Sequence, residues 1–388
     1  MTIEIDFSDR LKQLPPYLFV EIDKAKRKAR EEGRDVIDLG IGDPDTGTPK
    51  HIIEALNKAA EDPANHRYAL DAGLPALRQE ISAFMQKRYN VSFDPNTEIY
   101  PCIGSKDGLT HLPLGVVNPK DKVIIPEPGY PGYRAAVIFA DGKPVFVPLK
   151  ASKDFLPDLD KIKDMKDIKF MYVNYPNNPT AATAPKEFYQ RLIEIAREKG
   201  IIIASDLAYS EIYFDGEKPL SIFEIDGAKE VAIEFHSFSK TFNMTGWRIA
   251  WACGNPKLIA ALAKVKSNVD SGIFQAIQVA GITALRTSEQ ELDSLRAMYQ
   301  ERRDYLINGL RGIGWKITPP KATFYVWAKI PKKFKDSMET AKVFLEQANI
   351  VAAPGVGFGE SGEGYIRMTI TSPKERINEA VERLGKVL

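Results

Sequence analysis

The feature that most constrains this chain is an alternation of strand-like and helix-like segments over about 200 residues. Residues 200–206, Gly-Ile-Ile-Ile-Ala-Ser-Asp, are almost wholly apolar, which is typical of a strand covered by helices on both faces. The alternation therefore predicts an α/β fold whose large domain has a mostly parallel sheet flanked by helices. The expected strands are 98–103, 122–126, 143–149, 169–174, 200–206, 231–236 and 248–253. The expected helices are 50–61, 74–89, 104–117, 131–140 and 185–199, with a further long helix that starts near Pro256.

After residue 275 the pattern changes to that of a smaller α+β unit. A length of 388 residues also exceeds what one ordinary core contains. We therefore predict a large domain over 47–280 and a small domain formed by 1–46 and 281–388, with an N-terminal helix packed on the small domain. The expected elements of the small domain are helices at 16–32, 289–311 and 337–348 and strands at 315–317, 324–330 and 364–370.

Charge and cysteine content argue against several functions. The chain has 53 Lys and Arg against 52 Asp and Glu, so electrostatics favours neither nucleic acid nor an anionic membrane. Its two cysteines, Cys102 and Cys253, and its four histidines lack metal-ligand spacing, so no metal site is expected. Without a signal peptide or an apolar run of about 18 residues, we expect a cytoplasmic protein with no membrane span.

The candidate site begins with a lysine motif that follows the strand predicted at 231–236. Lys240 comes after two hydroxyl residues, Ser237 and Ser239, and Arg248 follows eight residues later. A loop lysine is usually a solvated charge, but the carboxyl ends of strands in open α/β sheets are where ligands bind. An amine that can react with a carbonyl, beside hydroxyls and a guanidinium that can bind a phosphate, suits a phosphorylated aldehyde.

Polar residues follow two other strands at the same expected sheet edge. Asp206 ends the apolar strand 200–206, with Tyr209 three residues later, and Asn178 lies in the turn after 169–174. A carboxylate there is costly to bury unless it is paired, so Asp206 is either the counter-ion of a buried cation or a helix N-cap. Asn178 either points into the site or only forms a turn with its proline.

Three further motifs are candidates for binding. Ser105 and Lys106 begin a helix after a glycine, where free backbone N–H groups can bind a phosphate. Tyr130 is either a stacking face or a core residue. Arg367 lies inside an apolar strand, where a guanidinium either binds a substrate carboxylate or forms a structural ion pair.

Taken together and in this order, these residues resemble the fold-type-I pyridoxal-phosphate aminotransferases of classes I and II. The resemblance covers nearly the whole chain and also includes Gly42-Asp-Pro-Asp and Tyr68 followed by Gly-Leu-Pro-Ala-Leu-Arg at 73–78. One residue departs from the family pattern: Ala181 stands where the family often has glycine after Asn-Pro-Thr. That puts only the local turn geometry in question.

The resemblance implies a role for each candidate residue. Lys240 would carry pyridoxal 5'-phosphate and move the proton between substrate and cofactor. Asp206 would keep the pyridine nitrogen protonated, Asn178 and Tyr209 would contact the ring 3'-oxygen, and Tyr130 would stack on the ring. The residues expected around the phosphate are Ser105, Lys106, Ser237, Ser239 and Arg248.

The resemblance also implies partners for the chain. Arg367, with the backbone of Gly42 nearby, would bind the α-carboxylate of a small amino acid or 2-oxo acid. Tyr68 would reach the phosphate in the neighbouring subunit, which implies a homodimer with the active site at the subunit interface.

Within the family, local phrases such as Gly104-Ser-Lys-Asp-Gly-Leu-Thr-His are most similar to LL-diaminopimelate aminotransferases. These enzymes exchange an amino group between LL-diaminopimelate and 2-oxoglutarate in lysine biosynthesis. Tyr17 and Asn268 are then candidates for binding the far end of the substrate, or they simply line the dimer seam. Three alternatives remain: a broader aspartate, alanine or aromatic aminotransferase, another pyridoxal-phosphate reaction such as carbon–sulfur elimination, and a non-catalytic binding module.

Overall fold

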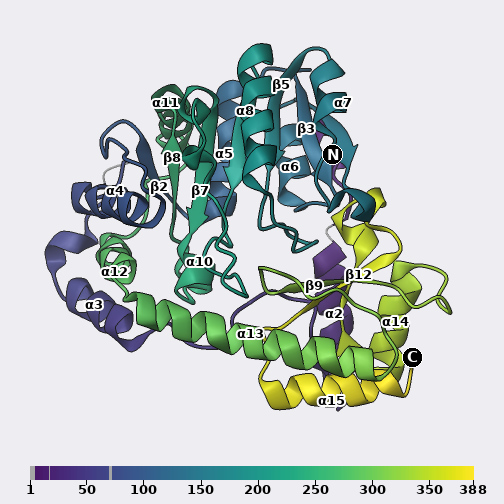
Figure 1. The fold of residues 1–388 in the computed structure, drawn as a ribbon. Coiled ribbons are helices and arrows are strands. Elements are labelled where there is room, and N and C mark those ends of the chain that lie inside the picture. Colours follow the sequence, from purple (N-terminus) through teal and green to yellow (C-terminus); the bar gives the residue numbers. More distant parts are fainter. Residues whose placement is uncertain (1–4, 17, 70–71) are drawn as a thin grey trace, which may run out of the picture.

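A seven-stranded sheet forms the centre of the larger unit of the structure, a computed structural model that describes residues 5–16, 18–69 and 72–388 (Figure 1). The strands lie in the order β2-β8-β7-β6-β5-β3-β4. β8 runs antiparallel to both of its neighbours, and the other pairings are parallel. The predicted mostly parallel sheet is therefore confirmed. Its strands are β2 (Ile99–Cys102), β3 (Lys122–Glu127), β4 (Lys143–Pro148), β5 (Ile168–Val173), β6 (Ile202–Asp206), β7 (Ala232–Ser237) and β8 (Ala250–Gly254).

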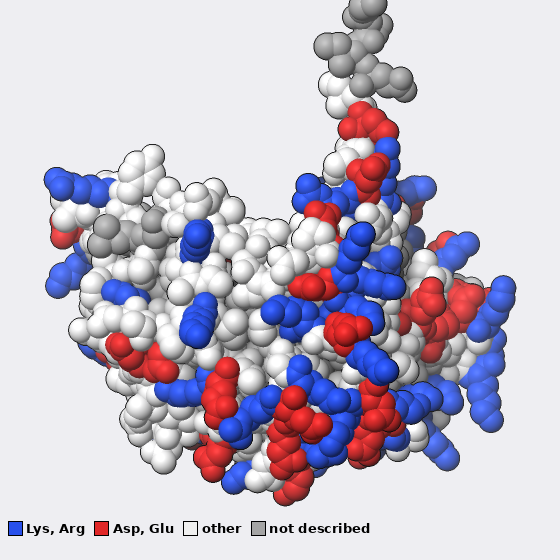
Figure 2. Space-filling view, turned by 90° about the horizontal axis from the view of Figure 1, so that it is seen from above, with Lys and Arg blue, Asp and Glu red and all other residues white. Residues whose placement is uncertain are grey.

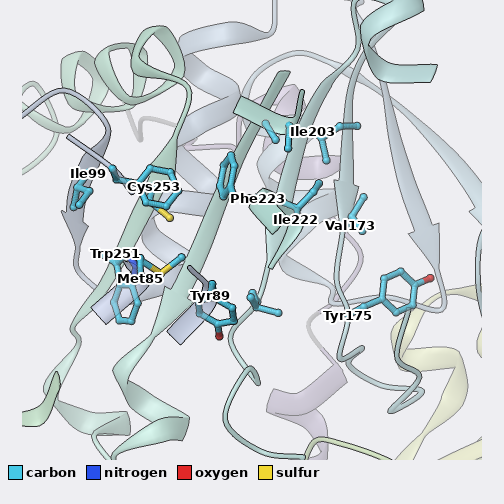
Figure 3. Close-up of a cluster of buried hydrophobic side chains, with 14 of the residues drawn as sticks. Met85, Tyr89, Ile99, Val173, Tyr175, Ile203, Ile222, Phe223, Trp251 and Cys253 are labelled. Carbon is cyan, nitrogen blue, oxygen red and sulfur yellow. The ribbon is translucent and has the colours of Figure 1, made fainter. Parts of the chain in front are cut away.

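Helices cover both faces of this sheet, as the apolar strands predict. On one face Leu112 of α5 and Leu262 of α11 belong to one buried cluster with Phe235 of β7. On the other, α4 and α8 enclose a core in which Met85 and Tyr89 lie beside Trp251 (Figure 3). The helices of this unit are α3 (Lys50–Ala60), α4 (Pro75–Tyr89), α5 (Ser105–Val116), α6 (Gly132–Phe139), α7 (Leu159–Asp164), α8 (Lys186–Lys199), α9 (Ala228–Val231), α10 (Phe238–Thr241), α11 (Pro256–Lys266) and α12 (Gln275–Leu285).

The second unit has a three-stranded antiparallel sheet in the order β11-β12-β9, covered by helices. The N-terminal helix belongs with this unit, because Ala29 of α2 packs on Val351 and β1 pairs with β10. The domain boundaries at residues 47 and 280 remain a prediction. The elements are α1 (Asp9–Lys12), α2 (Leu18–Glu31), α13 (Glu289–Gly312), α14 (Ser337–Ala348), α15 (Lys374–Gly385), β1 (Ile37–Asp38), β9 (Tyr325–Lys329), β10 (Ile350–Val351), β11 (Ala353–Pro354) and β12 (Tyr365–Thr369).

The structure departs from the expected elements at a few places. Residues 315–317 are not a strand, because the Trp315 N–H donates to the Leu310 carbonyl at the end of α13 and the Ile317 carbonyl accepts from the Arg311 side chain instead of a neighbouring strand. The long helices α12 and α15 were not expected, and neither were the short helices α1, α7, α9 and α10. α12 has only a weak polar face, so the periodicity of its sequence gives little indication of a helix. Its sequence is Gln-Ala-Ile-Gln-Val-Ala-Gly-Ile-Thr-Ala-Leu.

The charges on the surface are mixed. Figure 2 shows Lys and Arg side chains interspersed with Asp and Glu over much of one face, beside a broad area with few charges. This distribution agrees with a net charge of +1. Within the described ranges, no helix is long and apolar enough to cross a membrane.

Candidate active site

A cavity of about 370 Å³ lies where the carboxyl ends of β5, β6 and β7 face the second unit. Asn174, Asp206 and Ser237 reach it from the large sheet, and Tyr325 and Arg367 reach it from β9 and β12. Parallel strands that end at one edge bring distant parts of the sequence together. The predicted site residues that line the cavity are Gly42, Ser105, Lys106, Tyr130, Asn178, Asp206, Tyr209, Ser237, Ser239, Lys240, Arg248 and Arg367.

Lys240 holds an amine inside this cavity. The residue lies in α10, directly after β7, and its Nζ donates to the Gly42 carbonyl oxygen at 2.8 Å. Burial lowers the pKa of Lys240 to about 8; Asp43 opposes the shift, and Arg367 and Arg248 add to it. A substantial fraction of the amine is therefore neutral near pH 8, and only the neutral form can attack a carbonyl.

Asp206 is a buried carboxylate at the end of β6. Its Oδ2 accepts a hydrogen bond from the Tyr133 hydroxyl at 2.6 Å, and Oδ1 accepts from the Ala208 N–H at 3.3 Å. Residues 208–211 form a turn, so the helix N-cap interpretation is wrong. Burial raises the pKa of Asp206 to about 6, although the hydrogen bonds from Tyr133 and Ala208 and the nearby His236 act in the opposite direction. The carboxylate is thus placed to pair with a buried cation.

Tyr133 and Tyr325 are two contributors that the sequence did not single out. Tyr133 is buried and stacks on Tyr172 with ring centroids 4.4 Å apart, which fixes the hydroxyl that binds Asp206. The Tyr325 hydroxyl lies 2.7 Å from that of Tyr209. The only signal for Tyr133 was its position three residues after Tyr130, which places both near the start of α6.

Arg367 is enclosed by neutral oxygens and aromatic rings. Its Nη1 donates to Asn178 Oδ1 at 2.8 Å, and its Nη2 donates to the Gly40 carbonyl at 2.6 Å. The guanidinium carbon lies 4.1 Å from the centre of the Tyr325 ring. The turn that holds Asn178 has Ala181 at φ 59°, so alanine adopts the left-handed conformation at the position where the family often has glycine. Asn178 nevertheless reaches the cavity.

The start of α5 forms a cradle with Arg248. Gly104 precedes the helix with φ 82°, and a Cβ at this position would lie 1.9 Å from Arg248 Nη2. Glycine therefore lets the guanidinium lie directly against the N-terminus of the helix. Backbone N–H groups at that N-terminus, the Ser105 hydroxyl and a guanidinium together favour a phosphate.

Two predicted site residues that the structure describes, Tyr68 and Asn268, are not part of the cavity lining. Tyr68 is 87% exposed. Asn268 is exposed and donates to the Lys264 carbonyl at 2.8 Å, just after α11. Tyr17 lies outside the described residues. The structure of one chain thus brings together the central residues of the site but not those expected at a subunit interface.

Known proteins are similar to this chain over almost its full length. The chain is 52% identical over 381 residues to the LL-diaminopimelate aminotransferase of Aquifex aeolicus, covering 98% of each protein. It is 49% identical to the enzyme of the same name from Nitratidesulfovibrio vulgaris, covering 99% of this chain and 100% of that protein. Relatives this similar over their full length share a fold.

Solved structures give the same result. A substrate-bound BacF structure from Bacillus subtilis has a TM-score of 0.95 at 39% identity, covering 99% of this chain and 98% of that one. An aspartate aminotransferase double mutant from Thermus thermophilus has a TM-score of 0.92 at 30% identity, covering 99% of this chain and 100% of that one. The fold is therefore that of the fold-type-I aminotransferases.

The model of one family, described as aminotransferase class I and II, matches residues 34–384. This range contains every residue found in the cavity lining. The chain belongs to the class I and II aminotransferases.

Proposed function

We propose that the cavity binds pyridoxal 5'-phosphate and that the enzyme exchanges an amino group between LL-diaminopimelate and 2-oxoglutarate. The observation that carries the cofactor assignment is that Lys240, Asp206 and the Arg248–Gly104 cradle share one cavity. The substrate assignment is supported by the name shared by the two relatives at 52% and 49% identity.

The groups present in the cavity fit this cofactor. An amine with a pKa of about 8 suits an aldehyde, and the cradle at α5 suits a phosphate dianion. Asp206 is a buried carboxylate that accepts a hydrogen bond from the Tyr133 hydroxyl. A positively charged ring would offset the energetic cost of burying this carboxylate. When bound, the cofactor supplies an electron-withdrawing ring that stabilises negative charge at the substrate Cα.

The protein groups would orient the reactants and move protons. Lys240 Nζ would take the proton from the substrate Cα and pass it to the cofactor. Asp206 would hold a proton at the ring nitrogen, and Asn178 with Tyr209 would contact the 3'-oxygen, while Tyr130 would face the ring. The phosphate would be held by Ser105, Lys106, Ser237, Ser239 and Arg248.

Arg367 would bind the substrate α-carboxylate, with the Gly42 backbone nearby. A Cβ at Gly42 would lie 2.4 Å from the Tyr325 hydroxyl, so glycine keeps this side of the cavity open. A guanidinium that already lies between the Tyr325 and Phe358 rings is held in one orientation, which suits a bidentate bond to a carboxylate.

Replacing Arg367 by lysine should raise the KM for both the amino acid and the 2-oxo acid by about 100-fold, with a smaller change in kcat. Lysine keeps the charge but loses the planar pair of donors. Steady-state kinetics with both substrates would measure the effect, with Arg191→Lys, a partly exposed arginine of α8, as a matched control. An unchanged KM for both substrates would remove this role from Arg367.

A second copy of the chain would complete the site. Exposed side chains lie on the segment that contains Tyr68 and on the segment between α11 and α12. Tyr68, Val269 and Phe274 are 87%, 54% and 44% exposed. Gln275 Nε2 donates to the carbonyls of Arg67 and Tyr68, which holds these segments together. Homodimerisation would cover them and bring Tyr68 to the partner's phosphate site, with Tyr17 and Asn268 near the far end of the substrate. The broad area with few charges in Figure 2 is consistent with such a partner surface.

The proposed location is the cytoplasm, where thiols stay reduced. Cys102 and Cys253 are both free and buried. Burial raises the pKa of each thiol far above its usual value, which makes both unreactive.

The substrate proposal is tested by adding single amino acids to the purified cofactor-loaded protein without any 2-oxo acid. Conversion of the bound cofactor to its amino form changes its near-ultraviolet and visible absorption. A rapid change with LL-diaminopimelate and glutamate, but not with aspartate, alanine or phenylalanine, is expected. A change that favours aspartate, alanine or phenylalanine would support a broader aminotransferase, and release of pyruvate and ammonia would support a carbon–sulfur lyase.

A further inference from the structure

A buried lysine lies beneath the phosphate cradle, outside the cavity lining. Lys266, the last residue of α11, is 2% exposed. Its Nζ donates to Asp107 Oδ2 at 2.5 Å and to Asp270 Oδ2. Lysine is almost never buried in this way unless it is paired, and these two carboxylates are its partners. The ammonium thus links α11, the start of α5 and the segment that follows α11.

Asp107 connects this cluster directly to the cradle. It lies in the first turn of α5, two residues after Ser105. Its Oδ2 also accepts a hydrogen bond from the Ile103 N–H at 2.8 Å, which fixes the chain just before Gly104. Its Oδ1 lies 2.7 Å from His111 Nδ1. Asp107 therefore shapes the backbone that faces the proposed phosphate.

Asp107 also brings a negative charge to the place where a dianion would bind. An acidic residue in the first turn stabilises a helix, but it competes with an anionic ligand for the positive helix end. The repulsion is weak only if a cation neutralises the carboxylate. Lys266 is in contact with both Asp107 and Asp270, so its single positive charge can offset that of Asp107 only in part, while Asp107 keeps its bond to Ile103.

We propose that Lys266 is a positioning residue for the phosphate end of the cofactor. Its ammonium, shared between Asp107 and Asp270, lowers the negative charge at Asp107, so that Asp107 can fix the backbone at Gly104 and Ser105 with less repulsion of a phosphate. The inference rests on the proposed function, because it assumes that the cradle binds the phosphate of pyridoxal 5'-phosphate.

The test compares the affinity of cofactor-free protein for pyridoxal 5'-phosphate and for unphosphorylated pyridoxal. Lys266→Met should weaken binding of the phosphorylated form by about tenfold or more, while binding of pyridoxal changes by less than about twofold. Lys264→Met, an exposed lysine on the same helix, is the matched control and should change neither affinity. Equal weakening for the two ligands, or no weakening, would overturn the proposal.

A second substitution tests the charge argument. In the Lys266→Met background, Asp107→Asn should restore most of the affinity for pyridoxal 5'-phosphate, because the amide oxygen can still accept from Ile103 without carrying a charge. Absence of this recovery would reject electrostatic compensation.

Asp270→Asn provides a test that does not require an unpaired buried charge. It leaves Lys266 paired with Asp107. The substitution should tighten binding of pyridoxal 5'-phosphate without changing the binding of pyridoxal. Unchanged or weaker binding of pyridoxal 5'-phosphate would count against the proposal. If the wild-type protein bound neither ligand, the proposed function itself would be wrong. A wild-type protein that binds both, with variants that do not discriminate between them, would reject only the role of Lys266.

Discussion

Replacing Lys240 by alanine is expected to reduce the rate of amino transfer by at least about 10⁴-fold. Lys240 Nζ is the amine that the structure places at the Gly42 carbonyl inside the cavity, and its loss would remove both the proposed attachment point of the cofactor and the proposed proton carrier. The cofactor should still bind through the cradle at α5. Stopped-flow measurement of a single turnover with LL-diaminopimelate would quantify the loss, with Lys257→Ala, an exposed lysine of α11, as the control.

The Lys240→Ala variant should also differ from the wild type in how its free energy of unfolding depends on pH. Because burial lowers the pKa of Lys240 from 10.5 to about 8, the unfolded chain binds more protons than the folded chain between these values. The contribution of Lys240 to stability therefore rises from pH 8 to pH 10.5, by up to about 3 kcal/mol. Urea unfolding of the cofactor-free protein should show the wild type gaining this much relative to Lys240→Ala. Parallel stability profiles of the two proteins would contradict the lowered pKa of Lys240. Wild-type turnover in the variant would contradict its catalytic role.

The large sheet and most of the cavity were predictable because their signals are local. The apolar strand that ends in Asp206 and the motif from Ser237 to Lys240 each combine a strand with a polar turn. Since parallel strands end at one edge, the motifs could be assigned to a single site without knowing the strand order. The direction of β8 was not predictable, because Ala-Trp-Ala-Cys-Gly gives no indication of which way the strand runs.

Contacts between distant residues carry no comparable signal. Tyr133 and Asp206 are 73 residues apart, and Tyr209 and Tyr325 are 116 apart. Lys266 resembles any helical lysine in the sequence, although the fold buries it between two carboxylates. The features that tune the site depend on tertiary packing, whereas the residues proposed to perform the chemistry were found in motifs.

Asp206→Asn is expected to lower kcat by about 10³-fold or more and, at the same time, to stabilise the cofactor-free protein. The amide keeps the shape and can still accept a hydrogen bond from Tyr133, but it cannot hold a proton at the ring nitrogen. Steady-state kinetics at saturating cofactor would measure the catalytic loss. A loss of less than about tenfold would show that Asp206 does not act on the ring, since electrostatic contributions of this kind are usually larger.

The stability gain follows from the sign of the pKa shift. Burial raises the pKa of Asp206 from 3.8 to about 6, so the ionised form is disfavoured in the folded state. The cost is fully present above pH 6 and disappears as the pH falls below 3.8; it amounts to up to about 3 kcal/mol. Urea unfolding at pH 7.5 should therefore show the cofactor-free variant to be more stable than the wild type, with the difference shrinking from pH 6 toward pH 4. An equally or less stable variant at pH 7.5 would mean that the neighbours of Asp206 already offset its burial. The expected result instead identifies a carboxylate whose burial the protein tolerates because a bound cation compensates for it.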